Sequence, residues 1–114
     1  MSDDLFLKIL NREIPADIVY ENDEVLAFRD IDPQAPVHIL IIPKRRIATV
    51  NDLEDGDAEL MGRLLLAARD IAVSEKLADN GYRLVFNCNR HGCQSVYHIH
   101  LHLLGGRQLA WPPG

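Results

Sequence analysis

Three histidines at alternate positions are the residues of this chain with the clearest chemical potential. His98, His100 and His102 lie within the segment from Tyr97 to Leu104, and apolar side chains separate them. In a β-strand successive side chains point to opposite faces, so the three imidazoles are expected to share one face. The apolar residues between them then line the other face, toward a core. A strand face made of imidazoles indicates a reactive or ligand-binding site rather than simple packing.

Metal binding is one chemistry open to these side chains, because histidine is the commonest metal ligand. Residues i and i+4 of a strand lie roughly 13 Å apart at Cα, whereas a zinc–nitrogen bond is about 2 Å long. His98 and His102 therefore cannot easily share an ion, and a metal would need outside ligands such as His38 or a carboxylate. A cluster of Cys88, His91 and Cys93 has no fourth ligand nearby. The sequence thus favours no metal, and a second alternative is a set of buried histidines bonded to one another.

Catalysis on a phosphate accounts for the histidines and the loop before them together. Imidazole has an unperturbed pKa of about 6.5 and is a neutral nucleophile near pH 7. It can form a covalent bond to phosphorus, and a neighbouring imidazole can bind phosphate oxygens or transfer a proton. The preceding loop contains Gly92, Gln94 and Ser95, whose N–H groups and hydroxyl can meet developing negative charge. We therefore favour this chemistry over the metal and the structural alternatives.

Periodicity predicts the elements that position these residues. Two β-prone runs, 18–21 and 24–28, are separated by Asn22-Asp23, which has the composition of a turn. A long amphipathic helix through 60–72 is expected to end at Asn80-Gly81. The expected elements are a short helix around 5–10, a hairpin of strands 18–21 and 24–28, a central strand 37–42 buried on both faces, an amphipathic helix through 60–72, a strand 82–87 and the histidine strand 97–104. This order predicts an α+β domain built on an antiparallel sheet.

Composition limits the class of protein. A chain of 114 residues with 47% hydrophobic residues fits one globular domain over residues 1–114. A net charge of −5 argues against a general nucleic-acid binder. No apolar run approaches the length of a membrane span, and the acidic start of the chain does not resemble a signal peptide. We therefore expect a cytoplasmic protein without membrane partners, in which Cys88 and Cys93 are reduced thiols.

The segment His98-Ile99-His100-Leu101-His102-Leu103-Leu104 resembles the signature of the histidine-triad (HIT) superfamily. Further segments resemble the Hint branch, the purine nucleoside phosphoramidases; they are residues 12–21, 28–36, 92–102 and 105–107. The resemblance implies a five-stranded antiparallel sheet with two helices, and a homodimer with a continuous ten-stranded sheet. It also implies hydrolysis of the phosphorus–nitrogen bond of adenosine or guanosine 5′-monophosphoramidates, and of aminoacyl adenylates, without a cofactor or metal.

The resemblance also assigns roles by position. It makes His100 the nucleophile that becomes nucleotidylated before water releases AMP or GMP, and it places His102 at the phosphate, where it can assist the leaving group. It gives His98 and His38 the task of orienting His100 and fixing its tautomer. The expected substrate-binding residues are Asp30 at the ribose hydroxyls, Ile31 at the purine, Asn87 near ribose and phosphate, and Cys93, Gln94 and Ser95 in the phosphate loop. Cys93 departs from the branch, which commonly has glycine there.

Two other functions fit the same residues. A dinucleoside polyphosphate hydrolase of the same superfamily would use the same triad. A purine-nucleotide-binding scaffold protein would keep the binding groups, and its hydrolytic activity would be incidental. The complete triad favours catalysis over the scaffold, and the Hint-like segments favour the phosphoramidase over the polyphosphate hydrolase.

Overall fold

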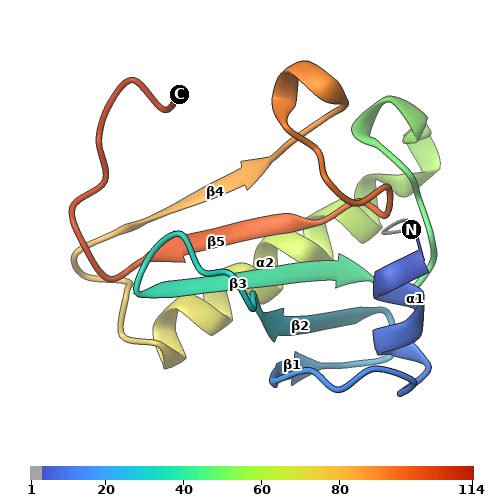
Figure 1. The fold of residues 1–114 in the computed structure, drawn as a ribbon, viewed down its shortest axis with the longest axis horizontal. Helices are drawn as coiled ribbons and strands as arrows, with labels where there is room; N and C mark the ends of the chain where they lie inside the picture. The colour runs from blue at the N-terminus through green and yellow to red at the C-terminus, as the bar shows by residue number, and fades with distance from the viewer. Residues whose placement is uncertain (1–3) are drawn as a thin grey trace.

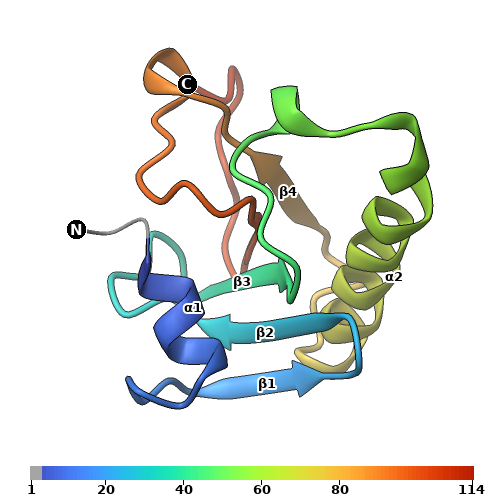
Figure 2. The ribbon, with the colours of Figure 1, turned by 90° about the vertical axis from the view of Figure 1, so that its right-hand side faces the viewer.

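The computed structural model describes residues 4–114 and shows one antiparallel sheet with an α-helix on each face (Figures 1 and 2). The strands follow the order β1-β2-β3-β5-β4. The elements are α1 (Leu5–Leu10), β1 (Ile18–Glu21), β2 (Val25–Arg29), β3 (Val37–Pro43), α2 (Ala58–Ser74), β4 (Tyr82–Phe86) and β5 (Leu101–Gly105), with short 3-10 turns between them. The predicted α+β class, the five-stranded antiparallel sheet and the two helices are confirmed.

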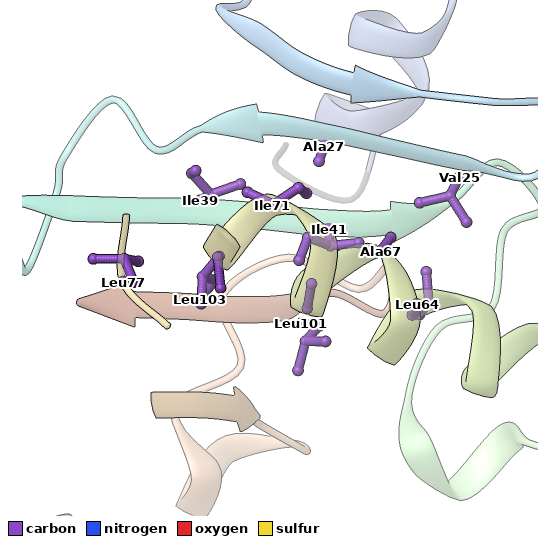
Figure 3. Close-up of a cluster of buried hydrophobic side chains, with 12 residues drawn as sticks. Val25, Ala27, Ile39, Ile41, Leu64, Ala67, Ile71, Leu77, Leu101 and Leu103 are labelled. Carbon is purple, nitrogen blue, oxygen red and sulfur yellow. The ribbon is translucent and has the colours of Figure 1, made fainter. Parts of the chain in front are cut away.

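The main core lies between α2 and one face of the sheet (Figure 3). Every second residue of β2, β3 and β5 points to this face, as the pleat requires. The buried residues are Val25, Ala27, Ile39, Ile41, Leu101 and Leu103 from the sheet, Leu64, Ala67, Ala68, Ile71 and Ala72 from α2, and Leu77 just after it. Full burial of each large aliphatic side chain is worth about 1.5–3 kcal/mol. The sheet is therefore fixed in one orientation, with the alternate residues facing away from α2.

The opposite face is covered only in part, by α1. Phe6 and Ile9 of α1 belong to one buried cluster with Leu26 and Phe28 of β2 and with Leu40 and Ile42 of β3. Because β3 has buried residues toward both helices, its predicted burial on both faces is confirmed. The same face continues beyond α1 into a polar region formed by histidines, which is described below.

The predicted end of the long helix was wrong. Helix α2 ends at Ser74, well before Asn80-Gly81. Lys76 adopts a left-handed conformation with φ of 62°, and the N–H groups of Lys76 and Leu77 donate to the carbonyls of Val73 and Ala72. This is a Schellman cap, which usually carries glycine at the left-handed position. The lysine there removes the compositional signal, so the sequence pattern pointed to the next glycine instead.

The predicted start of the histidine strand was also wrong. Strand β5 begins at Leu101, and its last pair with β3 joins Leu101 to Ile41. Continuing this register would place Ile99 opposite Pro43, which has no N–H to donate. The N–H of Ile99 bonds instead to the carbonyl of Ile47, outside the sheet, at 2.6 Å. His98 and His100 therefore precede the strand, although their side chains still lie on the face away from α2.

Within the described part of the chain, no helix combines the length and apolarity needed to cross a membrane.

Candidate active site at the histidine cluster

His38 and His102 meet across the central pair of strands. In the β3–β5 register His38 lies opposite Leu104 and His102 opposite Leu40, so the two histidines are diagonal neighbours on one face. Their Nε2 and Nδ1 atoms are 2.9 Å apart. The sheet itself thus adds a fourth histidine to the triad, from a strand more than 60 positions away in sequence.

The hydrogen bonds define the tautomers of this pair. The main-chain N–H of Gln34 donates to Nδ1 of His38 at 3.1 Å, so that nitrogen is an acceptor. The ring proton of neutral His38 is therefore on Nε2 and is donated to Nδ1 of His102. His102 in turn carries its proton on Nε2, which is buried and has no hydrogen-bond partner among the described residues. His102 consequently carries a buried N–H donor whose hydrogen-bonding capacity is unused among the described residues.

His100 has the opposite tautomer. Its Nδ1–H donates to the main-chain oxygen of His98 at 2.8 Å, which leaves the lone pair on Nε2. The ring of His98 donates from Nε2 to the carbonyl of Pro43, also at 2.8 Å. The expected roles of His98 and His38 in orienting His100 stay predictions, and the contacts show which atoms could serve them. His98 holds His100 through its carbonyl rather than its ring, and the ring of His38 bonds to His102.

Aromatic contacts hold the rings in place. The Phe6 ring meets His98 and His100 edge-on, at centroid distances of 5.8 and 5.1 Å. The centroids of His100 and His102 are 4.9 Å apart. A nucleophilic nitrogen and an N–H donor therefore lie on adjacent rings, both fixed by their second nitrogen.

Burial keeps these imidazoles neutral. Loss of solvation lowers the pKa of His38, His98 and His100 below the ordinary value for histidine. Burial, followed by the neighbouring His100 and His38, lowers the pKa of His102 to about 4. At pH 7 the four rings are therefore uncharged, as a nucleophilic His100 requires.

The depressed pKa values predict loss of stability in mild acid. Below about pH 6.5 the unfolded chain binds protons that the folded imidazoles resist, so the free energy of unfolding falls as pH falls. The loss is up to about 1.4 kcal/mol per pH unit for each histidine, and little change is expected above pH 7.5. Urea unfolding between pH 8 and 5.5 measures this slope, with the variant His102→Gln expected to show a shallower one. Equal stability at pH 7 and 5.5 would contradict the prediction.

The ribose and purine candidates lie on the loop before β3. Asp30 accepts the N–H of Asp32 at one oxygen, and its other oxygen is 3.6 Å from Nε2 of His38. The aspartate therefore caps its own loop through one oxygen, and its other oxygen borders the histidine cluster. The Ile31 side chain is 97% exposed, so it is available to a ligand rather than part of the core.

The phosphate-loop candidates occupy different environments. Asn87 is half-buried, Ser95 is exposed, and Gln94 is buried with 7% of its surface exposed. Cys93 is exposed and adopts a left-handed conformation with φ of 64°. The loop therefore keeps a conformation that suits glycine, although a cysteine stands there.

The variant Cys93→Gly is expected to raise the free energy of unfolding by up to about 1 kcal/mol. It removes the cost of a left-handed non-glycine residue, about 1–2 kcal/mol, and loses part of this gain to a more flexible unfolded chain. Cys93→Val should be destabilising, because a β-branched residue is poorly tolerated at positive φ. Denaturant unfolding tests both, with Cys88→Gly, at a position without positive φ, as the destabilised control. If Cys93→Gly unfolds with a lower free energy than the wild type, the inferred backbone strain at Cys93 is refuted.

One group of described residues has the geometry to hold a metal ion. The ligand atoms of Asp30, His38 and His102 lie within 4.8 Å of one another. Among residues 4–114, neither His98 nor the set of Cys88, His91 and Cys93 belongs to such a group. The group includes the outside ligands considered from the sequence, a carboxylate and His38. The hydrogen bond between His38 and His102 accounts for one of its short distances.

Several groups that build the site are main-chain atoms that the sequence does not mark. They are the N–H of Gln34 and the carbonyls of Pro43 and His98. The ring of Phe6, from α1, also packs directly on the rings of His98 and His100. The alternation of histidines reveals the ring positions, but no composition signal identifies the atoms that set their tautomers.

Comparison with known proteins agrees with this geometry. A model of the HIT domain matches residues 11–109. Purine nucleoside phosphoramidase of Escherichia coli strain K12 is 59% identical over 105 residues, covering 92% of this chain and 88% of that protein. Adenylylsulfatase HINT1 of Arabidopsis thaliana is 54% identical over 112 residues, covering 96% of this chain and 76% of that protein.

Solved structures show the same fold. The crystal structure of a HIT family hydrolase from Legionella pneumophila Philadelphia 1 has a TM-score of 0.95 and 61% identity, and the match covers 96% of this chain and 98% of that one. Family, fold and histidine cluster therefore agree, and the chain belongs to the HIT domain family, within its Hint branch.

Proposed function

We propose that this protein hydrolyses the phosphorus–nitrogen bond of purine nucleoside 5′-monophosphoramidates, and also cleaves aminoacyl adenylates, through a covalent nucleotidyl-His100. The observation that carries this proposal is the pair of opposite tautomers on adjacent rings. His100 offers a lone pair at Nε2, and His102 offers an unpartnered N–H. The name of the Escherichia coli relative supports the same substrate class.

In the first step Nε2 of His100 attacks the α-phosphorus and the bond from phosphorus to the amine breaks. The N–H of His102 donates to a phosphoryl oxygen, where negative charge builds up. The expelled nitrogen takes a proton from solvent. In the second step water attacks the phosphorus, returns a proton to solvent and releases AMP or GMP, which restores neutral His100.

His102 serves here as a fixed donor rather than as the acid. A cationic His102 would carry a proton on Nδ1, directly opposite the Nε2–H of His38. His38 can move its own proton to Nδ1 only by opposing the N–H of Gln34. This chain of donors, together with burial, keeps His102 neutral with its proton directed into the site.

We place the ribose hydroxyls at Asp30 and the purine against Ile31. The carboxylate is next to the histidine cluster, at 3.6 Å from His38, and the exposed isoleucine follows it directly in sequence. Asn87 and Ser95 complete the proposed contacts near the ribose and phosphate. No cofactor or resident metal is part of this reaction.

Trapping of the intermediate tests the function. Incubation with an adenosine phosphoramidate and rapid acid quench should yield a chain adenylylated at His100, mapped by mass spectrometry. Turnover of that substrate should exceed turnover of diadenosine triphosphate. Faster cleavage of diadenosine triphosphate would favour the polyphosphate hydrolase instead, and a modified residue other than His100 would refute the assigned nucleophile.

We further propose a homodimer formed through α2 and β4. Leu65, Leu66 and Val73 are each about half or more exposed on the outer side of α2. Strand β4 is an edge of the sheet and presents unpaired main-chain groups. Pairing of two β4 strands would create the ten-stranded sheet expected from the resemblance.

Sedimentation equilibrium measures the assembly. The wild-type chain should have twice the chain mass, and Leu66→Glu should be a monomer because it places a carboxylate in the apolar contact. Lys8→Glu, on α1, is the matched surface control and should stay dimeric. A wild-type monomer at micromolar concentration would contradict the proposed dimer.

A further inference from the structure

The hydrogen bonds of the Gln94 side-chain amide join it to main-chain groups of three other residues. Its Oε1 accepts the N–H of Asn89 at 2.9 Å. Its Nε2 donates to the carbonyls of Ala48 at 2.8 Å and Val96 at 3.1 Å. With 7% of its surface exposed, the side chain is directed into the protein. Its functional groups are therefore already occupied before any substrate binds.

The loop that Gln94 closes contains two residues in strained conformations. Asn89 and Cys93 have φ of 60° and 64°, although neither is glycine. Non-glycine residues with positive φ cost about 1–3 kcal/mol each and persist only when their surroundings fix them. The main-chain N–H of Gln94 donates to the carbonyl of Asn89 at 3.1 Å. Gln94 therefore bonds both main-chain groups of Asn89, the N–H through its side chain and the carbonyl through its own main chain.

The same side chain ties this loop to the segment that holds the histidines. The carbonyl of Ala48 accepts a hydrogen bond from the Gln94 amide. The carbonyl of the preceding residue, Ile47, accepts the N–H of Ile99, which lies between His98 and His100. The loop and the nucleophile-bearing segment are thus anchored to two consecutive carbonyls. A shift of the loop away from Ala48 would change its position relative to His100.

We propose that Gln94 is a positioning residue, which sets the phosphate loop at the correct place relative to His100 and does not contact the substrate. This inference rests on the proposed function, and it replaces the expectation that Gln94 binds the substrate directly. Misplacement of reacting groups by about 1 Å can cost about 100-fold in rate. Gln94 therefore acts on the rate through the loop.

Three variants test the role. Gln94→Met keeps the side-chain length without the amide and should lower kcat about 10- to 100-fold, with a smaller change in KM. Hydrogen exchange at the Asn89 N–H should become faster in the same variant. His91→Met, in the same loop but exposed, is the control and should leave both measurements unchanged.

Gln94→Glu gives a second signature that simple structural support would not give. If the new glutamate side chain is ionised, one of its negative oxygens faces the carbonyl oxygens of Ala48 and Val96 and is repelled by them. As a neutral acid it can donate one hydrogen bond to them, and burial favours the neutral form. Its kcat relative to wild type should therefore rise as pH falls from 8 to 5.5.

The outcomes separate the possibilities. A raised KM with unchanged kcat and unchanged Asn89 exchange would show direct substrate contact and overturn the proposal. A lower Tm with unchanged kcat and KM would show a structural role only and would also overturn it. If the wild type fails to hydrolyse phosphoramidates, the proposed function fails, whereas exchange at Asn89 still decides whether Gln94 fixes the loop.

Discussion

Replacing His100 with asparagine is expected to abolish turnover of an adenosine phosphoramidate and to leave AMP binding nearly intact. The asparagine amide can still donate to the carbonyl of His98, as the Nδ1–H of the histidine does. It has no nucleophilic lone pair in place of Nε2, so the covalent step is lost. Loss of a nucleophile typically costs 10⁴-fold or more, so kcat should fall by at least about 10⁴-fold.

Two measurements are needed for this variant: kcat from product release, and the AMP dissociation constant from calorimetry. His91→Asn is the matched control, because it changes an exposed histidine outside the cluster and should keep full activity. Unchanged turnover in His100→Asn would refute the assignment of His100 as the nucleophile. Tight AMP binding by a wild-type chain without measurable turnover would support the scaffold function instead.

Replacing His102 with alanine is expected to lower kcat/KM by about 10²- to 10³-fold, the usual effect of removing one donor at developing negative charge. The loss should be similar for alkylamine substrates and for substrates with a weakly basic leaving group. The reason is that, in the proposed mechanism, the Nε2–H of His102 acts on the phosphoryl oxygens, whereas the leaving group takes its proton from solvent.

The comparison of leaving groups makes this result decisive. If His102 were the acid, its loss would matter greatly for an alkylamine and little for a weakly basic leaving group. His102→Gln keeps an N–H donor and should recover part of the activity with both substrates. If the loss of kcat/KM in His102→Ala disappears for the substrate with the weakly basic leaving group, the fixed-donor role of His102 is contradicted.

The two expected results depend on one electrostatic feature, the neutrality of the cluster. Burial lowers the pKa of each of the four histidines, and that of His102 reaches about 4. A cationic His100 could not attack phosphorus, and a cationic His102 would disturb its bond to His38. The same burial that is expected to weaken the fold in mild acid therefore keeps the imidazoles in the form that the proposed chemistry needs at neutral pH.

Local pattern was sufficient for much of the fold. The period of two placed Leu101 and Leu103 toward a core and the histidines on the other face, and both placements hold in the structure. The nearly unbroken apolar run of residues 37–42, interrupted only by His38, predicted a strand covered on both sides, and β3 is such a strand. These features are set by the geometry of a single strand, so they can be predicted from neighbouring residues alone.

The ends of elements depended on contacts that local pattern does not contain. Helix α2 ends at a Schellman cap whose left-handed residue is Lys76, held there by carbonyls of the last turn and by the buried Leu77. Strand β5 begins only at Leu101, because Pro43 of the neighbouring strand β3 has no N–H to donate to the residue that would lie opposite it. In both cases a tertiary or cap hydrogen bond outweighs the local preference.

By itself, the sequence determined that this protein has imidazoles on one face beside a polar glycine-containing loop, and its motif indicated the HIT family. Only the tertiary structure decided what each ring can do. The pairing of His38 with His102 requires the register of β3 against β5, and the tautomers require the N–H of Gln34 and the carbonyl of His98. The physical reason is that the donor or acceptor opposite a ring nitrogen, rather than the identity of the ring, decides which nitrogen holds the proton.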